Sequence, residues 1–329
     1  MRHTRTHTAL LTSACLTVLT LVTPGISAAT QPANTVAPSS PAAARASAVD
    51  GRIAYIDLGD NRSSFDVYTV RRGGQGVRRL TATGDAFSPR WSPDGRRIAF
   101  ERNRVAAGTQ LWTMGAHGGH KRLLVAGLSG GRSPSWSPNG RRIVFAADAA
   151  RGTRQLFVLN QRSHQVRRLT DPGPRRWSAD QPAWSPRGDR VAFIRYRPRS
   201  RPELYTVRLD GTGLRRLTRT GFAELDPEWS PDGSRIAYTR SRRELPCGSD
   251  VFVIGADGGT TARVVDRGCD DSDPDWAPDG RRIVLYSNQQ QGTPGWRRHS
   301  GLWTVRPDGS DLRMLVQGVF KGSPDWQAR

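Results

Sequence analysis

Residues 88–100 read SPRWSPDGRRIAF, and this stretch decides the fold. After Ser88 come a Pro-x-Trp triplet and the tetrapeptide Ser-Pro-Asp-Gly, followed by a segment in which polar and apolar residues alternate. Asp and Gly tolerate the backbone conformations that a tight hairpin turn demands. Alternation with period two is typical of a strand with one buried face. The stretch therefore predicts two antiparallel strands joined by a short turn.

The same pattern recurs along the chain at intervals of 45, 48, 45, 47 and 50 residues, counted from Trp to Trp. A third alternating segment and a fourth, Arg-rich segment follow in the units, as at residues 110–114 and 121–124. Four short strands in about 45 residues are the dimensions of a propeller blade. The recurring tryptophans are Trp91, Trp136, Trp184, Trp229, Trp276 and Trp326.

The two ends of the chain complement each other. Residues 51–80 supply a second, third and fourth strand without a first one, whereas residues 323–326 supply a first strand alone. Pairing the two fragments completes a sixth blade and leaves no open sheet edge. We predict an all-β, six-bladed β-propeller with four antiparallel strands per blade, closed by the C-terminal strand. We expect the six tryptophans to pack between blades, each burying roughly 150–250 Å².

The first 49 residues differ from the rest. Residues 1–29 combine early arginines, an apolar run and small residues near Ala28, which is the order of a secretory signal peptide. Residues 30–49 are rich in Ala, Pro and Ser and predict a flexible linker. The propeller domain is then 50–329, and we expect an exported protein: extracellular, periplasmic or associated with the cell wall.

The motif Pro-x-Trp-Ser-Pro-Asp-Gly-x-x-Ile-Ala-Phe, followed by Leu-aromatic-x-Val and Asp-Gly-x-x-x-Arg-Leu-Thr, resembles the WD40-like PD40 repeat of the TolB family over residues 50–329. This resemblance implies a propeller that binds a protein partner of the bacterial envelope. Here the linker stands where that family has an N-terminal α/β domain. PD40 repeats also form the propellers of prolyl-oligopeptidase-like peptidases and of oligogalacturonate lyases, so the repeat alone does not decide the chemistry.

The sequence carries no signature of catalysis. It has no Gly-x-Ser-x-Gly elbow, which a serine hydrolase would need. His117, His120, His164 and His299 are scattered in or beside turns and show no metal-ligand spacing. We therefore predict no catalytic residue, no cofactor and no metal site.

Two cysteines remain after the predicted signal peptide. Cys247 precedes the third strand of its blade and Cys269 follows the fourth. The hairpin between them brings the two thiols opposite each other, and an exported pair of this kind should oxidise. A disulfide closing this loop would add roughly 3 kcal/mol of stability.

The formal charge of +21 favours an acidic partner. Most arginines occupy repeated positions, which spreads them around the ring rather than into one groove, and export argues against nucleic acid. We expect a monomer, peripheral to a membrane at most, whose partner is an envelope protein or an anionic cell-wall polymer.

The variable loops and the channel mouth are the candidate binding face, since loops on a rigid frame commonly carry function. An alternative remains open, in which the carboxylates there only cap turns and pair with neighbouring arginines. We predict a noncatalytic scaffold; the second hypothesis is a carbohydrate-active, polysaccharide lyase-like enzyme with its site at the channel mouth. The candidate ligand-binding residues are Asp85, Asp180, Glu224, Asp226, Asp271, Asp273, Trp177 and Trp296.

Overall fold

The computed structural model describes residues 51–58, 64–104, 108–149, 152–242, 248–265, 270–288, 300–318 and 321–327. The signal peptide and linker predicted over residues 1–49 lie outside these ranges, as do Cys247, Cys269 and Trp296. Within these ranges the regular structure is 24 β-strands without an α-helix. Accordingly, no helix in the described part is long and apolar enough to cross a membrane.

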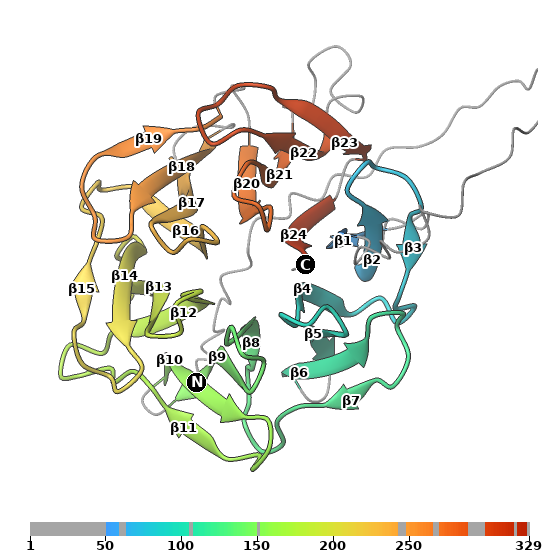
Figure 1. Cartoon of the computed structure of the whole chain (residues 1–329). Helices are drawn as coiled ribbons and strands as arrows, with labels where there is room; N and C mark the ends of the chain where they lie inside the picture. Colours follow the sequence, from blue (N-terminus) through green and yellow to red (C-terminus); the bar gives the residue numbers. More distant parts are fainter. Residues whose placement is uncertain are drawn as a thin grey trace, which may run out of the picture. The chain divides into compact units, whose positions relative to one another are not determined.

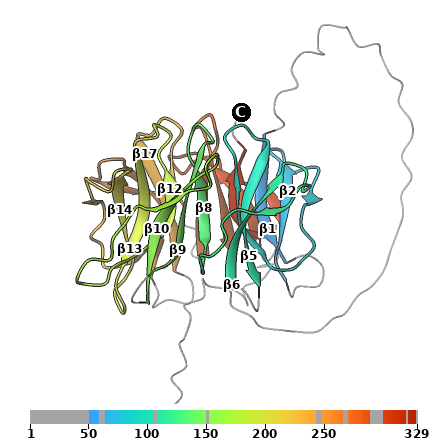
Figure 2. The same ribbon diagram turned by 90° about the horizontal axis from the view of Figure 1, so that it is seen from below.

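The strands form six four-stranded antiparallel sheets arranged as blades around a central axis (Figure 1). Blade 1 is β24-β1-β2-β3, and blades 2 to 6 are β4–β7, β8–β11, β12–β15, β16–β19 and β20–β23. Figure 2 shows the strands running from one face of the ring to the other. The predicted six-bladed propeller is confirmed.

The first strand of each blade is innermost and the fourth lies at the outer rim (Figure 1). The innermost strands are β24 (Lys321–Trp326), β4 (Ala86–Trp91), β8 (Arg132–Trp136), β12 (Ser178–Trp184), β16 (Ala223–Trp229) and β20 (Asp270–Trp276). The second strands are β1 (Arg52–Asp57), β5 (Arg97–Arg104), β9 (Arg142–Ala149), β13 (Arg190–Tyr196), β17 (Arg235–Ser241) and β21 (Ile283–Asn288).

The third strands lie between the second and fourth strands of each blade, and short turns connect them to the fourth strands at the outer rim. They are β2 (Asp66–Arg71), β6 (Gly108–Gly115), β10 (Thr153–Asn160), β14 (Glu203–Arg208), β18 (Ser249–Gly255) and β22 (Gly301–Val305). The fourth strands are β3 (Arg78–Arg79), β7 (Arg122–Leu123), β11 (Val166–Arg168), β15 (Arg215–Arg216), β19 (Thr261–Arg263) and β23 (Arg313–Gln317).

The ring closes through β24, which pairs antiparallel with β1 (Figure 1). Ile53 stands opposite Trp326 in this pairing. Gln327 adds two links, because its backbone N–H donates to the Arg52 carbonyl at 2.8 Å and its side-chain amide donates to the Gly95 carbonyl of blade 2 at 2.9 Å. The predicted closure by the C-terminal strand is confirmed.

The Ser-Pro-Asp-Gly motif builds the turn between first and second strands. The Ser92 hydroxyl donates to Asp94 at 2.5 Å and accepts the Arg97 backbone N–H at 2.9 Å. Asp94 in turn accepts the Arg96 N–H at 3.1 Å, and Gly95 takes a φ of 65°. The Ser and Asp side chains thus bond the backbone of their own turn, which explains why the repeat retains these residue types.

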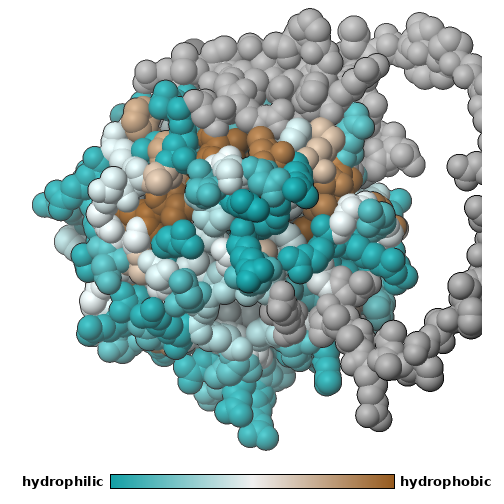
Figure 3. Space-filling model, turned by 45° about the horizontal axis from the view of Figure 1, so that its top comes forward, coloured by the Kyte–Doolittle hydropathy of each residue, from teal (hydrophilic) through white to brown (hydrophobic). Residues whose placement is uncertain are grey.

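The core lies within and between the blades. The middle of each second strand is fully buried, as at Ile98, Ala99 and Phe100. The six repeated tryptophans are only 4–7% exposed, and the indole N–H of Trp136 donates to the Arg90 carbonyl of the preceding blade at 3.1 Å. The tryptophans therefore join neighbouring sheets. Hydrophilic side chains cover most of the described surface that is visible in Figure 3.

The closure predicts a stability test. Deleting residues 324–329 removes Trp326 and half of β24, and leaves β1 as an open edge. Loss of a buried Trp alone costs about 3–5 kcal/mol, so the whole ring should unfold at a lower urea concentration, followed by circular dichroism. Deleting only residues 328–329 serves as the control and should leave the midpoint unchanged. Equal midpoints for both truncations would contradict the closure as a source of stability.

Candidate functional site

Each innermost strand is bulged at the residue before its Pro-x-Trp proline. These residues are not glycines, yet all six adopt a positive φ of 46–52°, and the strand register shifts at each bulge. Such a backbone conformation is costly for non-glycine residues and persists only where the surroundings hold it. The six bulge residues are Ser88, Ser133, Gln181, Asp226, Asp273 and Ser323.

Neighbouring blades hold these bulges in place. The Ser133 N–H donates to Glu101 at 2.7 Å, the Asp226 N–H to the Gln181 side chain at 3.0 Å, and the Asp273 N–H to the Thr239 hydroxyl at 3.1 Å. In each case the acceptor belongs to the preceding blade. The preceding blade therefore holds the strained backbone of these bulges in place, and the bulges depend on the intact ring.

The residue between Pro and Trp makes a second link between innermost strands. Asp325 accepts the Trp91 backbone N–H at 2.5 Å, and Asp275 accepts that of Trp326 at the same distance. Ser135 accepts the Trp184 N–H at 2.9 Å. Where this residue is Ser or Asp, as in these three repeats, its side chain links two innermost strands.

These two positions together gather charge at the centre of the ring. Arg90 lies 3.8 Å from Asp325, and its charge also interacts with Glu228, Asp275 and Asp273. We call this set, completed by Asp226, the channel cluster: Arg90, Asp226, Glu228, Asp273, Asp275 and Asp325. It contains five carboxyl groups for one guanidinium group.

Burial first, and neighbouring carboxyl groups second, raise the pKa values of the acids in the cluster. Burial, followed by the neighbouring Asp273 carboxyl, raises the pKa of Asp226 to about 8, although Arg90 opposes the shift. Burial raises the pKa of Glu228 to about 7 and that of Asp325 to about 6, with Arg90 again lowering both. The cluster therefore retains protons near neutral pH.

Asp275 and Asp273 follow the same rule. Burial, then Asp325 and Glu228, raise the pKa of Asp275 well above its usual value. Burial also raises the pKa of Asp273, while the backbone N–H of Ser323 lowers it. For Arg90, burial lowers the pKa, but the surrounding carboxylates raise it overall.

Chemically, the cluster can exchange protons or accept a cationic group. Among the residues the structure describes, no group of three His, Cys, Asp or Glu side chains is arranged to hold a metal ion.

Only two of the candidate carboxylates predicted from sequence belong to this cluster, Asp226 and Asp273. Three others are instead ion-paired with arginines of their own or the preceding blade. Asp85 pairs with Arg102 at 2.9 Å, Asp180 with Arg154 at 2.5 Å, and Glu224 with Arg240 at 3.2 Å. These three fit the alternative of carboxylates that pair with neighbouring arginines.

The remaining candidates lie elsewhere. Asp271, on β20, is completely buried. Trp177 is half-buried, with the guanidinium groups of Arg195 and Arg197 over its ring at 4.6 and 4.9 Å. The two guanidinium groups thus form cation–π contacts with the Trp177 ring within the protein itself.

Four members of the cluster are not among the residues predicted from the sequence: Arg90, Glu228, Asp275 and Asp325. They occupy the middle position of Pro-x-Trp, a motif that by itself predicts only packing between blades. A usable signal was present, since this position is Arg, Ser, Ala, Glu, Asp and Asp in the six repeats while its neighbours remain Pro and Trp. Variation inside a constant motif indicates a side chain that the fold does not dictate.

Comparison with known proteins agrees with the repeat and the fold. The family described as PD40, TolB beta propeller domain, matches residues 39–181 and 175–328. The chain belongs to this family. A search of the curated proteins found no match.

Solved structures share the architecture of this PD40 chain. TolB from Acinetobacter baumannii has a TM-score of 0.67 at 22% identity, over 85% of this chain and 67% of that one. A putative TolB from Agrobacterium tumefaciens has a TM-score of 0.62 at 19% identity, over 83% and 89%. Oligogalacturonate lyase from Vibrio parahaemolyticus has a TM-score of 0.55 at 14% identity, over 81% and 74%. At these identities the likeness concerns the fold.

The raised pKa of Asp226 predicts a pH-dependent stability difference. Its carboxyl has a pKa of about 8 in the folded protein against 3.8 ordinarily, so the folded state binds more protons between these values. The contribution of this group to stability is therefore present below about pH 4 and is lost as the pH rises through 8. Asp226→Asn should gain stability relative to the unchanged protein over this window, by on the order of 1 kcal/mol or more at pH 8.

Urea unfolding between pH 2 and pH 9 measures this difference, and Asp232→Asn provides a control of opposite sign. Hydrogen bonds from Ser230 and Ser234 lower the pKa of Asp232 to about 2, so its contribution is lost as the pH falls from 4 towards 2. Asn139 holds the same place in another turn, so the substitution suits the fold. Parallel pH profiles for Asp226→Asn and the unchanged protein would refute the buried, protonated state.

Proposed function

We propose that this chain is an exported, noncatalytic binding scaffold that recognises an envelope protein through its variable loop face and channel. The observation that supports this most is the channel cluster, in which five carboxyl groups surround Arg90. Buried charges are costly unless they are paired. A partner that inserts a basic side chain would supply the missing counter-charge and favour the deprotonated carboxylates.

The fold supports a binding role as well. The bulges and inter-blade hydrogen bonds hold the channel residues on strands rather than on loops, which keeps their geometry fixed. Two of the structures with this fold are titled as TolB proteins, and the chain belongs to the same PD40 family. A preformed site of this kind loses little conformational freedom when a partner binds.

The basic outer surface would play a secondary part. With a formal charge of +21, the protein would be attracted to anionic polymers of the cell envelope. This attraction is weak, long-range and sensitive to salt. Export follows from the signal-peptide pattern over residues 1–29.

A capture experiment with envelope extract tests the proposal. The immobilised protein should retain a protein partner, and the double variant Asp226→Asn/Asp273→Asn should retain at least tenfold less of it. Asp257→Asn is a matched control, because Asp257 is a surface carboxylate with a side chain 73% exposed. Equal capture by the double variant and the control would show that the channel cluster is not the binding site.

The second candidate function is a carbohydrate-active enzyme, which the similarity in fold to oligogalacturonate lyase favours. Turnover assays on acidic polysaccharides, with and without added divalent metal ions, separate the two functions. The scaffold proposal expects no turnover. Metal-dependent turnover that disappears in Asp180→Ala and Asp273→Ala would instead establish the enzyme.

A further inference from the structure

The turns between third and fourth strands dock against the preceding blade. In blade 2, Gly118 has a φ of +85°, and a Cβ atom there would lie 2.8 Å from the Leu80 carbonyl oxygen of blade 1. Gly258 of blade 5, with a φ of +84°, also lies against the preceding blade, where a Cβ atom would be 3.8 Å from the Leu217 carbonyl oxygen. The residue directly before each glycine, His117 or Asp257, therefore holds the same place at its blade boundary.

At the boundary of blades 4 and 5, this place carries an acid that neutralises two arginines. Asp257 pairs with Arg190 at 3.4 Å and with Arg215 at 3.5 Å. Arg190 begins the second strand of blade 4, and Arg215 begins its fourth strand. This boundary thus contains a set of two cations and one anion that spans two blades.

The boundary of blades 1 and 2 has the same two arginines but lacks the acid. Arg52 begins the second strand of blade 1 and Arg78 begins its fourth strand. Arg78 pairs in register with Thr69, as Arg215 pairs with Thr206. At the place of Asp257, this boundary has His117.

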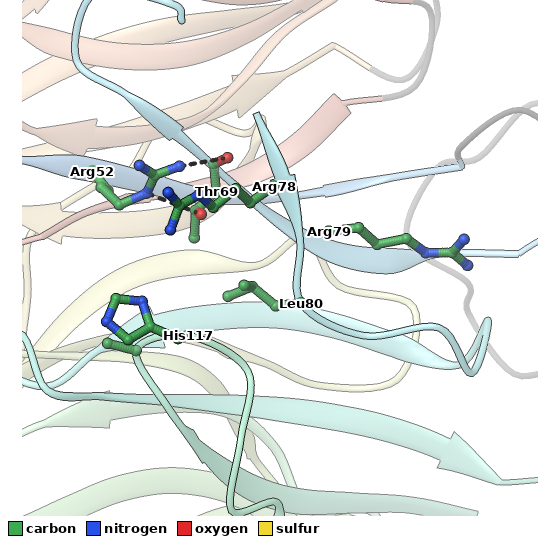
Figure 4. Close-up of a pocket in the computed structure, with 7 residues that line it drawn as sticks. Arg52, Thr69, Arg78, Arg79, Leu80 and His117 are labelled. Carbon is green, nitrogen blue, oxygen red and sulfur yellow. Dashed lines mark hydrogen bonds between the residues drawn. The ribbon is translucent and has the colours of Figure 1, made fainter. Parts of the chain in front are cut away.

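A cavity of about 350 Å³ opens where the acid is missing (Figure 4). Figure 4 shows the guanidinium groups of Arg52 and Arg78 side by side on one wall, with His117 on the opposite wall. Arg79 points out of the cavity and pairs with Asp66 at 2.6 Å. None of the lining residues is acidic: Arg52, Thr69, Arg78, Arg79, Leu80, Ala116 and His117.

The hydrogen bonds leave two of these side chains available to a ligand. Arg52 is held in place, since its Nε donates to the Thr69 hydroxyl at 3.1 Å and its Nη2 to the Gly76 carbonyl at 2.5 Å. Within the described part of the chain, the side chains of Arg78 and His117 form neither a hydrogen bond nor an ion pair. A second cavity, of about 340 Å³, is lined mostly by apolar residues such as Leu123 and Val125 and does not share this character.

We propose that this cavity is a binding site for a phosphate-type oxyanion, held by Arg78 and His117 beside the fixed charge of Arg52. An anion there would replace the carboxylate that Asp257 supplies at the equivalent boundary. A phosphate carries several acceptor oxygens and can therefore accept from donors on both walls at once. The site lies among the short turns, on the face opposite the variable loops, and is independent of the channel cluster.

Titration calorimetry with inorganic phosphate at low ionic strength tests the proposal. The unchanged protein should show one saturable site. Arg78→Ala should weaken binding by about tenfold or more, the effect of losing one charge-assisted hydrogen bond. His117→Asp should abolish binding, because it restores the acid that this place carries in blade 5. Arg215→Ala is the matched control and should bind phosphate as the unchanged protein does, since Asp257 already neutralises its boundary.

Thermal unfolding confirms that each variant is folded, which the surface positions of Arg78, His117 and Arg215 favour. Titration with glycerol phosphate distinguishes the source of the anion: tighter binding than inorganic phosphate indicates a phosphoryl group on a larger molecule, and equal binding indicates the free ion. Absence of saturable binding overturns the proposal. Binding that survives His117→Asp, or that Arg215→Ala weakens as much as Arg78→Ala does, overturns it too.

Discussion

The hydrogen-bonded pairing of β24 with β1 is the constraint on which the rest of the structure depends. It joins the two ends of the chain inside blade 1, so that each blade has a neighbour on both sides. A bulge or buried tryptophan is stable only against the blade before it, as the Trp136 indole and the Ser133 N–H illustrate. An open ring would leave one boundary without such partners, and the strain stored in its bulge would have no compensation.

The channel cluster shows that the contacts between innermost strands can also lower the stability of the ring. The middle residue of Pro-x-Trp can accept a backbone N–H from the next blade, and a serine hydroxyl does this as a carboxylate does, as Ser135 does for Trp184. At Asp275 and Asp325 the chain uses carboxyl groups for this duty. Burial raises the pKa values of these two carboxyl groups although Arg90 opposes the shift, so their deprotonation destabilises the ring near neutral pH. Groups that oppose stability in this way are typical of functional sites.

The repeat also serves as an internal standard for the surface. Because glycine-containing turns dock on the preceding blade at several boundaries, a residue that differs at one of these boundaries can be compared directly with its equivalents. Asp257 neutralises Arg190 and Arg215, whereas His117 leaves the corresponding cavity of blade 1 lined by positive side chains. The packing is preserved at both boundaries, so the difference concerns charge and not the fold. The proposed anion site therefore depends on the charge at this boundary and not on the channel cluster.

The sequence by itself determined the architecture of this protein, because every local signal repeats. The Ser-Pro-Asp-Gly turns, the alternating strands and the spacing of the tryptophans follow from short-range rules, and the incomplete ends required the closure between β24 and β1. The tertiary structure decided which carboxylates meet. Asp85, Asp180 and Glu224 pair with arginines through strand pairing and blade contact, whereas Asp226 and Asp273 meet side chains from two other blades at the axis. These contacts depend on residues far apart in the chain and on bulges that no residue type announces, since Ser, Gln and Asp all adopt the same positive φ there. Only the closed ring brings them together.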